Sequence, residues 1–483
     1  MSSLMREVLP SAYSMIMSNR SIGYTMESAI ADIIDNSISA GATIIDIQTP
    51  PHSSEIICFI CDNGHGMDLV ELDNAMTFGG KDYIAERKAT DLGRFGLGLK
   101  TASLSQCRKF SVISKRKEED LVGGFWDLDS VKFHNQWQYE TISSEICSEK
   151  IMNTPLEEYE SGTLVIWEKF DKLRETTKDR LFSEFIKEMA STQSHLELVF
   201  HRYLAGEVGL NKIIIRYNNY PLVPNDPFLV GKNPSVVEPT IINSEGHQIK
   251  IISHKLLHPS KLTPEEMSRL QIKGTLMNTQ GFYVYRNSRL LIWGTWFGMA
   301  HRTDRTKLAR IQIDVPNTSD HLWSLDIKKS KALPPSFLKP QLQNIIENVS
   351  NISIRTYRGR VKIKKNIVPF WSRTVIEEKY VKYEINRKNP LIELLFSQLD
   401  KRQMDLFEKL ITNLELHLPI AQLHLDLQHD TSITNEIESE NYNSNELQVL
   451  LNFFVEMGIS KDKILHMEPF CNNQEFIKLN KGS

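Results

Sequence analysis

Residues 26–42 read MESAIADIIDNSISAGA, and their pattern decides the fold of the region around them. Apolar residues recur at intervals of three or four positions, which predicts an amphipathic helix, and Gly41 supplies a C-terminal stop. Asp32 and Asn36 are four residues apart on another face of this helix. An asparagine oxygen can take one position on Mg²⁺, while a nearby carboxylate can orient a water for attack. A solvated polar helix face is the alternative interpretation.

The stretch after the helix predicts two strands, TIIDI at 43–47 and EIICFIC at 55–61, because both are rich in β-branched and apolar residues. Asp62 ends the second strand, and Gly64 and Gly66 follow with one residue between them. A buried carboxylate there can accept a hydrogen bond from an exocyclic amine, and the glycines allow a flat ring to approach the backbone. A hairpin turn at Asp-Asn-Gly is the alternative.

A glycine-rich loop, DLGRFGLGLKTAS, occupies residues 91–103. It is not a P-loop, since GxxxxGK[ST] is absent from the sequence, and its order GxxGxG reverses the dinucleotide-binding fingerprint. Taken alone, it can equally be a plain connection, because glycine serves any tight turn. Further along, Gly162 and Thr163 open the strand GTLVIW, where a hydroxyl could complete the same pocket.

These pieces occur in one order, and DIIDNSISAGA, DNGHGM, GRFGLGLKTAS and GT resemble the hallmark motifs of the GHKL ATPases. This superfamily includes gyrase B, MutL, heat-shock chaperones and histidine kinases. The resemblance is strong over residues 20–170 and looser for a transducer-like region up to about residue 365. Within the superfamily, the lysine after the glycines is similar to the bacterial-type MORC-like branch, whereas the MutL loop usually reads GFRGEAL. Histidine kinases are less similar, because no phosphoacceptor helix or sensor segment is visible.

The resemblance implies roles for individual residues. Asp32 would be the water-activating carboxylate, Asn36 the Mg²⁺ ligand and Asp62 the adenine reader. Residues 78–97 would form a mobile lid over bound ATP, with glycines at both ends, and the loop that follows would cradle the phosphates through backbone N–H groups and one lysine. The implied nucleotide-binding positions are completed by Gly64, Gly66, Met67, Gly93, Gly96, Leu97, Gly98, Leu99, Lys100, Thr101 and Thr163.

Two further features concern catalysis. Many relatives have Glu where this chain has Asp32, and the shorter side chain predicts slow hydrolysis. A shifted helix that compensates for the shorter reach is the alternative. The segment SLDIKKSKALPP at 324–335 resembles the lysine-bearing loop of MutL, which implies that a lysine here reaches the γ-phosphate. Lys329 and Lys331 point to one side if the segment is extended, so one of these two is expected to do so. A solvated basic loop is the alternative.

The fold class expected is α+β, in three parts. Residues 1–205 would form a Bergerat-type α/β sandwich ATPase domain. Residues 206–367 would form a transducer-like α+β domain, because strand patterns restart at NKIIIRY (211–217). Residues 368–483 would form a mainly helical C-terminal region of unknown role.

Composition sets limits on location and partners. Of the 483 residues, 41% are hydrophobic and 24% charged, which is typical of a globular protein. No apolar run is long enough to span a bilayer and the N-terminus lacks a signal-peptide core, so we expect a cytoplasmic protein without membrane association. The five cysteines form no disulfide framework, and Cys58 and Cys61 are expected in the core rather than on zinc. A net charge of −3 gives no overall attraction to nucleic acid.

The function expected is that of a MORC-like ATPase in which Mg-ATP gates homodimerisation and clamping of a nucleic acid, for which DNA is the candidate. A basic segment, IRTYRGRVKIKK at 354–365, could contact a phosphate backbone, or it could be a solvated basic face. By resemblance, the process would be DNA-related or phage defence, with other defence proteins as partners. A chaperone-like ATPase that remodels a protein client is the alternative. A MutL-type nuclease is disfavoured, because LDLQHDTS shares only QH with the nuclease metal motif.

Overall fold

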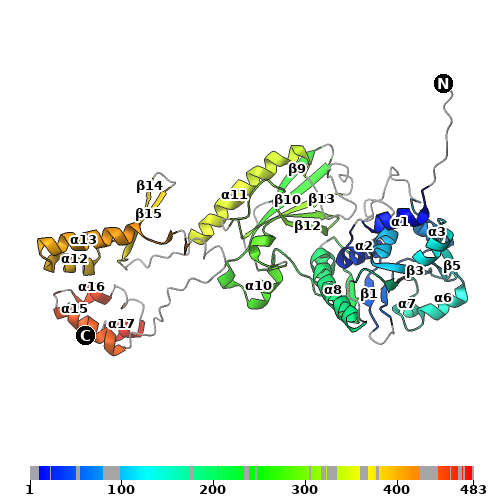
Figure 1. Cartoon of the computed structure of the whole chain (residues 1–483), viewed down its shortest axis with the longest axis horizontal. Helices are drawn as coiled ribbons and strands as arrows, with labels where there is room; N and C mark the ends of the chain where they lie inside the picture. The colour runs from blue at the N-terminus through cyan, green and yellow to red at the C-terminus, as the bar shows by residue number, and fades with distance from the viewer. Residues whose placement is uncertain are drawn as a thin grey trace, which may run out of the picture. The chain divides into compact units, whose positions relative to one another are not determined.

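The structure is a computed structural model of the chain, which forms two compact units, residues 1–355 and 356–483 (Figure 1). It describes residues 10–21, 23–50, 55–79, 98–173, 178–207, 209–232, 239–244, 247–272, 274–303, 306–316, 323, 334–358, 368–376, 380–420, 422–423, 444–456, 458, 460–465, 470 and 474–480. None of the helices in these ranges combines the length and the apolar character that a membrane crossing requires.

The first unit begins with a mixed sheet in the order β5-β4-β3-β6-β2-β1-β7-β8. Neighbouring strands in this sheet pair antiparallel except β1 and β7, which pair parallel. The strands are β1 Ile44–Gln48, β2 Cys58–Asp62, β3 Cys107–Lys115, β4 Val122–Asp127, β5 Glu140–Ile142, β6 Gly162–Phe170, β7 Ile214–Tyr217 and β8 Tyr220–Pro221. The expected strands at residues 43–47, 55–61 and 162–167 are therefore confirmed.

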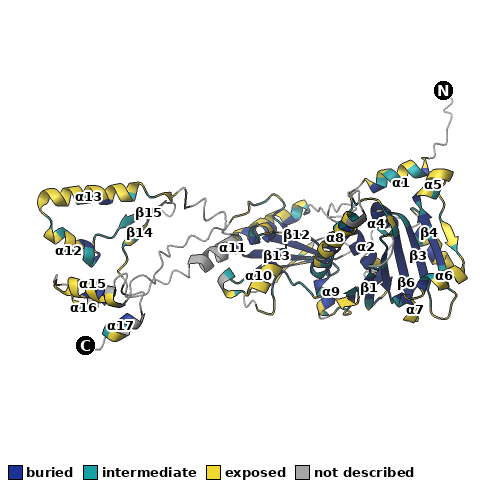
Figure 2. Ribbon diagram, turned by 60° about the horizontal axis from the view of Figure 1, so that its bottom comes forward, coloured by how far each residue is buried: buried dark blue, intermediate teal, exposed yellow. Residues whose placement is uncertain are grey.

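Helices cover both faces of this sheet. The larger core lies on the face that carries α1, α2, α4 and α8, and a smaller cluster lies on the opposite face beneath α6 and α7. Figure 2 shows the strands largely buried between these layers. The helices are α1 Ala12–Arg20, α2 Met26–Ser39, α3 Leu69–Met76, α4 Gly98–Gln106, α5 Leu128–His134, α6 Ser144–Ile151, α7 Pro155–Glu158, α8 Lys178–Val199 and α9 His201–Ala205.

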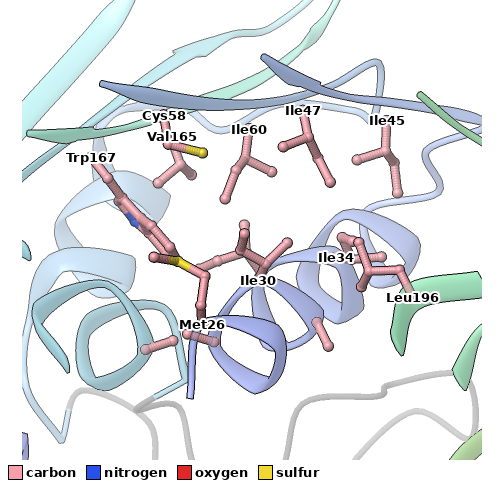
Figure 3. Close-up of a cluster of buried hydrophobic side chains, with 14 of the residues drawn as sticks. Met26, Ile30, Ile34, Ile45, Ile47, Cys58, Ile60, Val165, Trp167 and Leu196 are labelled. Atoms are coloured by element: carbon pink, nitrogen blue, oxygen red, sulfur yellow. The ribbon is translucent and has the colours of Figure 1, made fainter. Parts of the chain in front are cut away.

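Helix α2 is the helix that the sequence predicts, and its ends have clear causes. Thr25 caps its N-terminus in a capping box with Ser28. Gly41, at φ +76°, provides the left-handed residue after its C-terminus. Between these ends, the apolar face packs beneath β1, β2 and β6, as Figure 3 shows for Ile30 and Ile34. This packing fixes the rotation of α2 and thereby the direction of its polar residues.

A second sheet in the same unit has the order β12-β11-β13-β10-β9. Helix α11 covers one face through Leu342, Ile346 and Val349, which recur at helical spacing. Tyr283, Tyr285 and Leu290 instead join the large core of the first sheet. The elements are β9 Thr240–Ser244, β10 His247–Lys255, α10 Pro264–Leu270, β11 Gly281–Arg286, β12 Arg289–Thr295, β13 Ala309–Val315 and α11 Lys339–Arg358, with 3₁₀ helices at Pro259–Lys261, Leu276–Thr279 and Ser336–Leu338.

One sequence expectation is wrong at the join between the two sheets. We expected NKIIIRY to open the second domain, but Ile214–Tyr217 forms β7, which pairs with β1 in the first sheet. Ile213 and Ile215 are buried in the first core while Ile214 is exposed, the alternation of a strand with one buried face. The first sheet therefore extends beyond residue 205.

The described residues of the second unit form one hairpin and several helices. A cluster of apolar side chains that includes Leu447, Leu451 and Phe470 forms its described core. The elements are β14 Trp371–Ile376, β15 Tyr380–Ile385, α12 Pro390–Gln398, α13 Lys401–Leu416, α15 Ser444–Glu456, α16 Lys461–Leu465 and α17 Gln474–Asn480. The mixed α+β class and the mainly helical C-terminal region agree with the sequence expectation.

Candidate active site

Helix α2 presents its two predicted site residues in different surroundings. Asp32 is buried, at 6% exposure, whereas Asn36, one turn further along, is exposed. A solvated polar face is therefore excluded for Asp32. No hydrogen bond of the Asn36 side chain is found among the described residues, so its amide oxygen is accessible to a ligand.

Asp32 is held by groups that come from outside α2. Tyr24 Oη donates to its Oδ2 at 3.0 Å, and the Tyr24 hydroxyl also contacts Thr101 of α4. Burial, reinforced by the Asp32 carboxylate, raises the pKa of Tyr24 well above its ordinary value, so the phenol remains a donor. On the other oxygen, Nη2 of Arg289 lies 3.6 Å from Oδ1. Asp32 is thus oriented from both sides.

Asp62 is the second buried carboxylate of the site. Cys58 and Ile60 of β2 face the large core, and Asp62 points the same way because it lies two positions further along the strand. There its Oδ2 accepts from Ser37 Oγ of α2 at 2.8 Å, and its Oδ1 accepts from the Gly64 N–H at 2.9 Å.

The backbone N–H of Thr163 on β6 also donates to the Asp62 carboxylate. Burial raises the pKa of Asp62, and these hydrogen bonds oppose the rise. The Thr163 hydroxyl lies 3.0 Å from Ser114 Oγ, which accepts the N–H of Met67 at 2.8 Å. Strands β2, β3 and β6 therefore build this end of the site together.

The glycines after β2 serve close backbone packing. A Cβ on Gly66, which has φ +70°, would lie 2.1 Å from the Lys115 carbonyl oxygen. A Cβ on Gly64 would lie 2.9 Å from Ala40. The chain continues from here into α3, so the alternative of a hairpin turn at Asp-Asn-Gly is wrong. These contacts explain both glycines without a ring against them, and a ring approach at Gly66 stays a prediction.

Helix α4 begins within the predicted phosphate-binding loop. It starts at Gly98, so the N–H groups of Gly98, Leu99 and Lys100 lie in its first turn, where a helix attracts anions. The ammonium group of Lys100 is buried and donates to the Ala75 carbonyl oxygen at 2.6 Å, at the end of α3. The other residues predicted to contact or cover the phosphates lie outside the described residues. They are Gly93, Gly96, Leu97, Lys329, Lys331 and residues 80–97 of the lid.

Four residues of the site were missed from the sequence: Tyr24, Ser37, Ser114 and Arg289. Ser37 directly follows Asn36, so its place on α2 could have been found from helical geometry. Arg289 opens the otherwise apolar strand RLLIWGT, and a charged residue in such a strand is a signal for a buried partner. Nothing local distinguishes Tyr24 or Ser114.

The donors and acceptors fit a magnesium nucleotide. A carboxylate has about four lone-pair sites, and the Asp62 carboxylate accepts three donors, which leaves room for an amine. The accessible amide oxygen of Asn36 suits Mg²⁺, which takes oxygen ligands and retains waters. No group of three or more His, Cys, Asp or Glu side chains that could hold a metal ion is found within the described ranges, so the metal would also rely on phosphate oxygens. Cys58 and Cys61 are buried core residues, as expected.

Residues 24–163 match a family model described as "Histidine kinase-, DNA gyrase B-, and HSP90-like ATPase". Among known proteins, mouse ATPase MORC2B is 36% identical over 93 residues, which are 18% of this chain and 9% of that protein. Human ATPase MORC2 is 31% identical over 94 residues, which are 19% of this chain and 9% of that protein. The chain thus covers less than a tenth of the length of these relatives.

The matched range contains every described residue of the site except Arg289. This range is therefore similar to the GHKL ATPases. Within that superfamily its relationship is to the MORC ATPases.

Proposed function

We propose that this protein binds and hydrolyses Mg-ATP. The observation that carries the proposal is the buried Asp62 carboxylate at the end of β2, with its donors Ser37 and Gly64 beside α2. In this proposal its remaining acceptor capacity receives the exocyclic amine of adenine, and the ring lies near Gly66 and Met67. Because a buried acceptor is left unpaired by a base that lacks this amine, the hydrogen bond would make recognition of adenine selective.

Hydrolysis is assigned to Asp32. Tyr24 holds one of its oxygens, and the carboxylate can accept a proton from an attacking water. Asn36, one turn away, would hold Mg²⁺, which would neutralise charge on the phosphates. Because Asp32 is shorter than Glu, the attacking water lies further from its base and turnover is slow.

The phosphates are assigned to the first turn of α4, with Thr101, and to the preceding loop residues Gly93, Gly96 and Leu97. The lid at 78–97 would begin at an anchored point, because Phe78 packs edge-on against Trp126 and Trp137. A lysine of the second domain, Lys329 or Lys331, would contact the γ-phosphate. Substituting each by Met should leave nucleotide binding intact while one variant loses hydrolysis; full activity in both would remove this assignment.

The biological output proposed is an ATP-gated clamp. Residues 1–205 would form the ATPase domain and 206–367 the transducer, of which β7 and β8 extend the sheet of the ATPase domain, and 368–483 would form an accessory region. Closure on ATP would join two copies and bring the basic segment 354–365 to a nucleic acid, for which DNA is the candidate. We place this activity in the cytoplasm, in a DNA-related or phage-defence process with other defence proteins as partners. Buried free cysteines such as Cys107 and Cys147 support a reducing compartment.

Two measurements test the clamp. Sedimentation of the full chain with a non-hydrolysable ATP analogue should show a dimer that is absent without nucleotide. DNA retention should require the same analogue and should fall steeply as salt rises, because phosphate contacts release counterions. A monomer at saturating analogue would count against dimerisation, and retention without nucleotide would count against gating.

A second candidate function, chaperone-like remodelling of a protein client, is favoured by the surface of α13. Leu406, Leu410 and Leu414 recur every fourth residue and are 71%, 55% and 53% exposed. Such an apolar stripe could bind unfolded polypeptide. If the chain suppresses aggregation of a denatured client in an ATP-dependent way and shows no retention of DNA, this second function replaces the clamp.

A further inference from the structure

Arg289 is the first residue of β12 in the second sheet, but its guanidinium group lies against α2. Nη1 is 2.8 Å from Oδ2 of Asp35, and Nη2 is 3.6 Å from Oδ1 of Asp32. The Arg289 side chain is only 7% exposed. One buried arginine therefore faces both carboxylates of α2, including the carboxylate to which we assign water activation.

The position of this arginine is fixed by its neighbours. Asn287 and Ser288 form the tight turn between β11 and β12, both with positive φ. Tyr203 Oη of α9 donates to the Asn287 carbonyl oxygen at 2.6 Å. The guanidinium carbon lies 5.5 Å from the centroid of the Phe200 ring, a cation–π contact. The hairpin is thus held so that its first residue reaches α2.

These contacts affect the carboxylate in two ways. Arg289 approaches Oδ1 of Asp32 while Tyr24 donates to Oδ2, so the plane of the carboxylate is set from both sides. The cation also offsets the repulsion between two buried carboxylates on one helix. The arrangement therefore orients the proposed base.

We propose that Arg289 is a positioning residue for ATP hydrolysis, through which the placement of the second sheet controls the hydrolytic step and not nucleotide binding. This inference rests on the proposed function, in which Asp32 activates water. It goes beyond that function because it assigns coupling to a residue outside the 24–163 match. The described partners of Asp62 do not include Arg289, so adenine recognition should be unaffected.

The test compares full-length wild type with Arg289→Gln, Arg289→Lys and Arg302→Gln. Arg302 is the control, because it lines one pocket together with Arg289 but is exposed and donates to the carbonyl oxygen of Gly294 at 2.8 Å. Steady-state turnover gives kcat and KM, calorimetry gives the affinity for a non-hydrolysable ATP analogue, and thermal unfolding reports folding.

We expect Arg289→Gln to lower kcat roughly 10- to 100-fold, as misplacement of a catalytic group does, with KM and analogue affinity within about twofold. Arg289→Lys keeps the charge but reaches one carboxylate only, so it should recover part of the loss. Arg302→Gln should match wild type. In an Asp32→Asn background, Arg289→Gln should lower the residual turnover no further, because both changes act through one base.

Wild-type kcat in Arg289→Gln overturns the inference. An equal loss of kcat and analogue affinity also overturns it, because that pattern indicates a structural role. If Arg289→Gln fails to fold, Arg289→Lys decides: a lowered kcat at unchanged affinity supports the inference, and wild-type kcat overturns it. Wild-type turnover in Asp32→Asn alone would instead remove the assignment of Asp32 as the base, and an absence of ATP turnover in the wild type would remove the proposed function, so these failures are distinguishable from failure of the inference.

Discussion

The Asp62 end and the Asp32 end of the candidate site differ in the parts of the chain that build them. The Asp62 carboxylate accepts hydrogen bonds from Ser37, Gly64 and Thr163, all within the range that matches the ATPase family. The Asp32 carboxylate accepts a hydrogen bond from Tyr24 of that range, but it also faces Arg289 of the second sheet. The described partners of Asp62 therefore all come from the matched range, whereas Asp32, to which we assign hydrolysis, also has a partner in the second sheet.

Under the proposed function, this difference would allow ATP to be bound without being hydrolysed. The buried ion pair of Arg289 with Asp35 links the hairpin to α2, because loss of one partner leaves an uncompensated buried charge. A movement of that hairpin would alter Asp32 and leave Asp62 unchanged. Substitutions at the two ends should accordingly change different measured quantities.

The largest effect is expected at the Asp32 end. Asp32→Asn fills the same space but removes the base, so hydrolysis should fall by roughly 10²-fold or more. The affinity for a non-hydrolysable analogue should stay within a few-fold of wild type, as calorimetry would show. Asp32→Glu, which keeps a carboxylate, is the control and should retain more turnover than Asn. Loss of analogue binding in Asp32→Asn would mean that the Asp32 end also contributes to nucleotide binding.

At the other end, Asp62→Asn should weaken ATP binding. An amide must turn its NH₂ group toward the donors Ser37 or Gly64, which leaves polar groups unpaired at a cost of about 1–3 kcal/mol. That cost corresponds to an affinity loss of roughly 5- to 150-fold, with kcat at saturating ATP little changed.

Asp46→Asn is the matched control for Asp62→Asn. Asp46 is an equally buried carboxylate on the neighbouring strand β1, where it pairs with Arg216 at 2.6 Å and with Tyr159. Its substitution should lower stability without lowering affinity. If Asp62→Asn binds ATP as wild type does, the adenine assignment is wrong.

The local pieces of this site could be predicted from the sequence because short-range physics determines them. Helical spacing and Gly41 fixed the extent of α2, and the apolar run before Asp62 fixed the end of β2. The alternation of strand side chains then directs Asp62 toward the core. These features need no knowledge of the rest of the chain.

The remaining features depend on contacts between distant segments. The sequence of β7 predicts a strand, but it does not predict that this strand pairs with β1. The pairing of Arg289 with Asp32 and Asp35 likewise requires the second sheet to be in place. The Asp62 end was therefore the more predictable end of the site.

A smaller effect should separate packing from recognition at the Asp62 end. Gly66→Ala places a Cβ against the Lys115 carbonyl oxygen at a positive φ, which should lower stability by about 1–3 kcal/mol. Gly98→Ala is the control for stability, because, apart from its chain neighbours and the backbone of its own helix, no atom of the described residues lies within 4 Å of its Cβ position. Thermal unfolding without nucleotide measures both. Unchanged stability in Gly66→Ala would show that the turn can relax. The predicted approach of the adenine ring would then be the remaining explanation for this glycine.

The smallest effect is expected at Asn36, which lies on α2 beside the Asp32 end and one residue before Ser37 of the Asp62 end. Asn36→Ala removes one oxygen ligand of the proposed Mg²⁺ site, so ATP affinity in magnesium should fall about tenfold, or about 1.4 kcal/mol. Affinity in the presence of a chelator should not change, because the loss acts through the metal. Asn36→Asp retains an oxygen ligand and should keep the magnesium dependence. A magnesium titration of ATP binding measures all three proteins. An equal loss of ATP affinity with and without magnesium would mean that Asn36 contacts the nucleotide directly. Asn36 would then act on ATP itself and not through a metal.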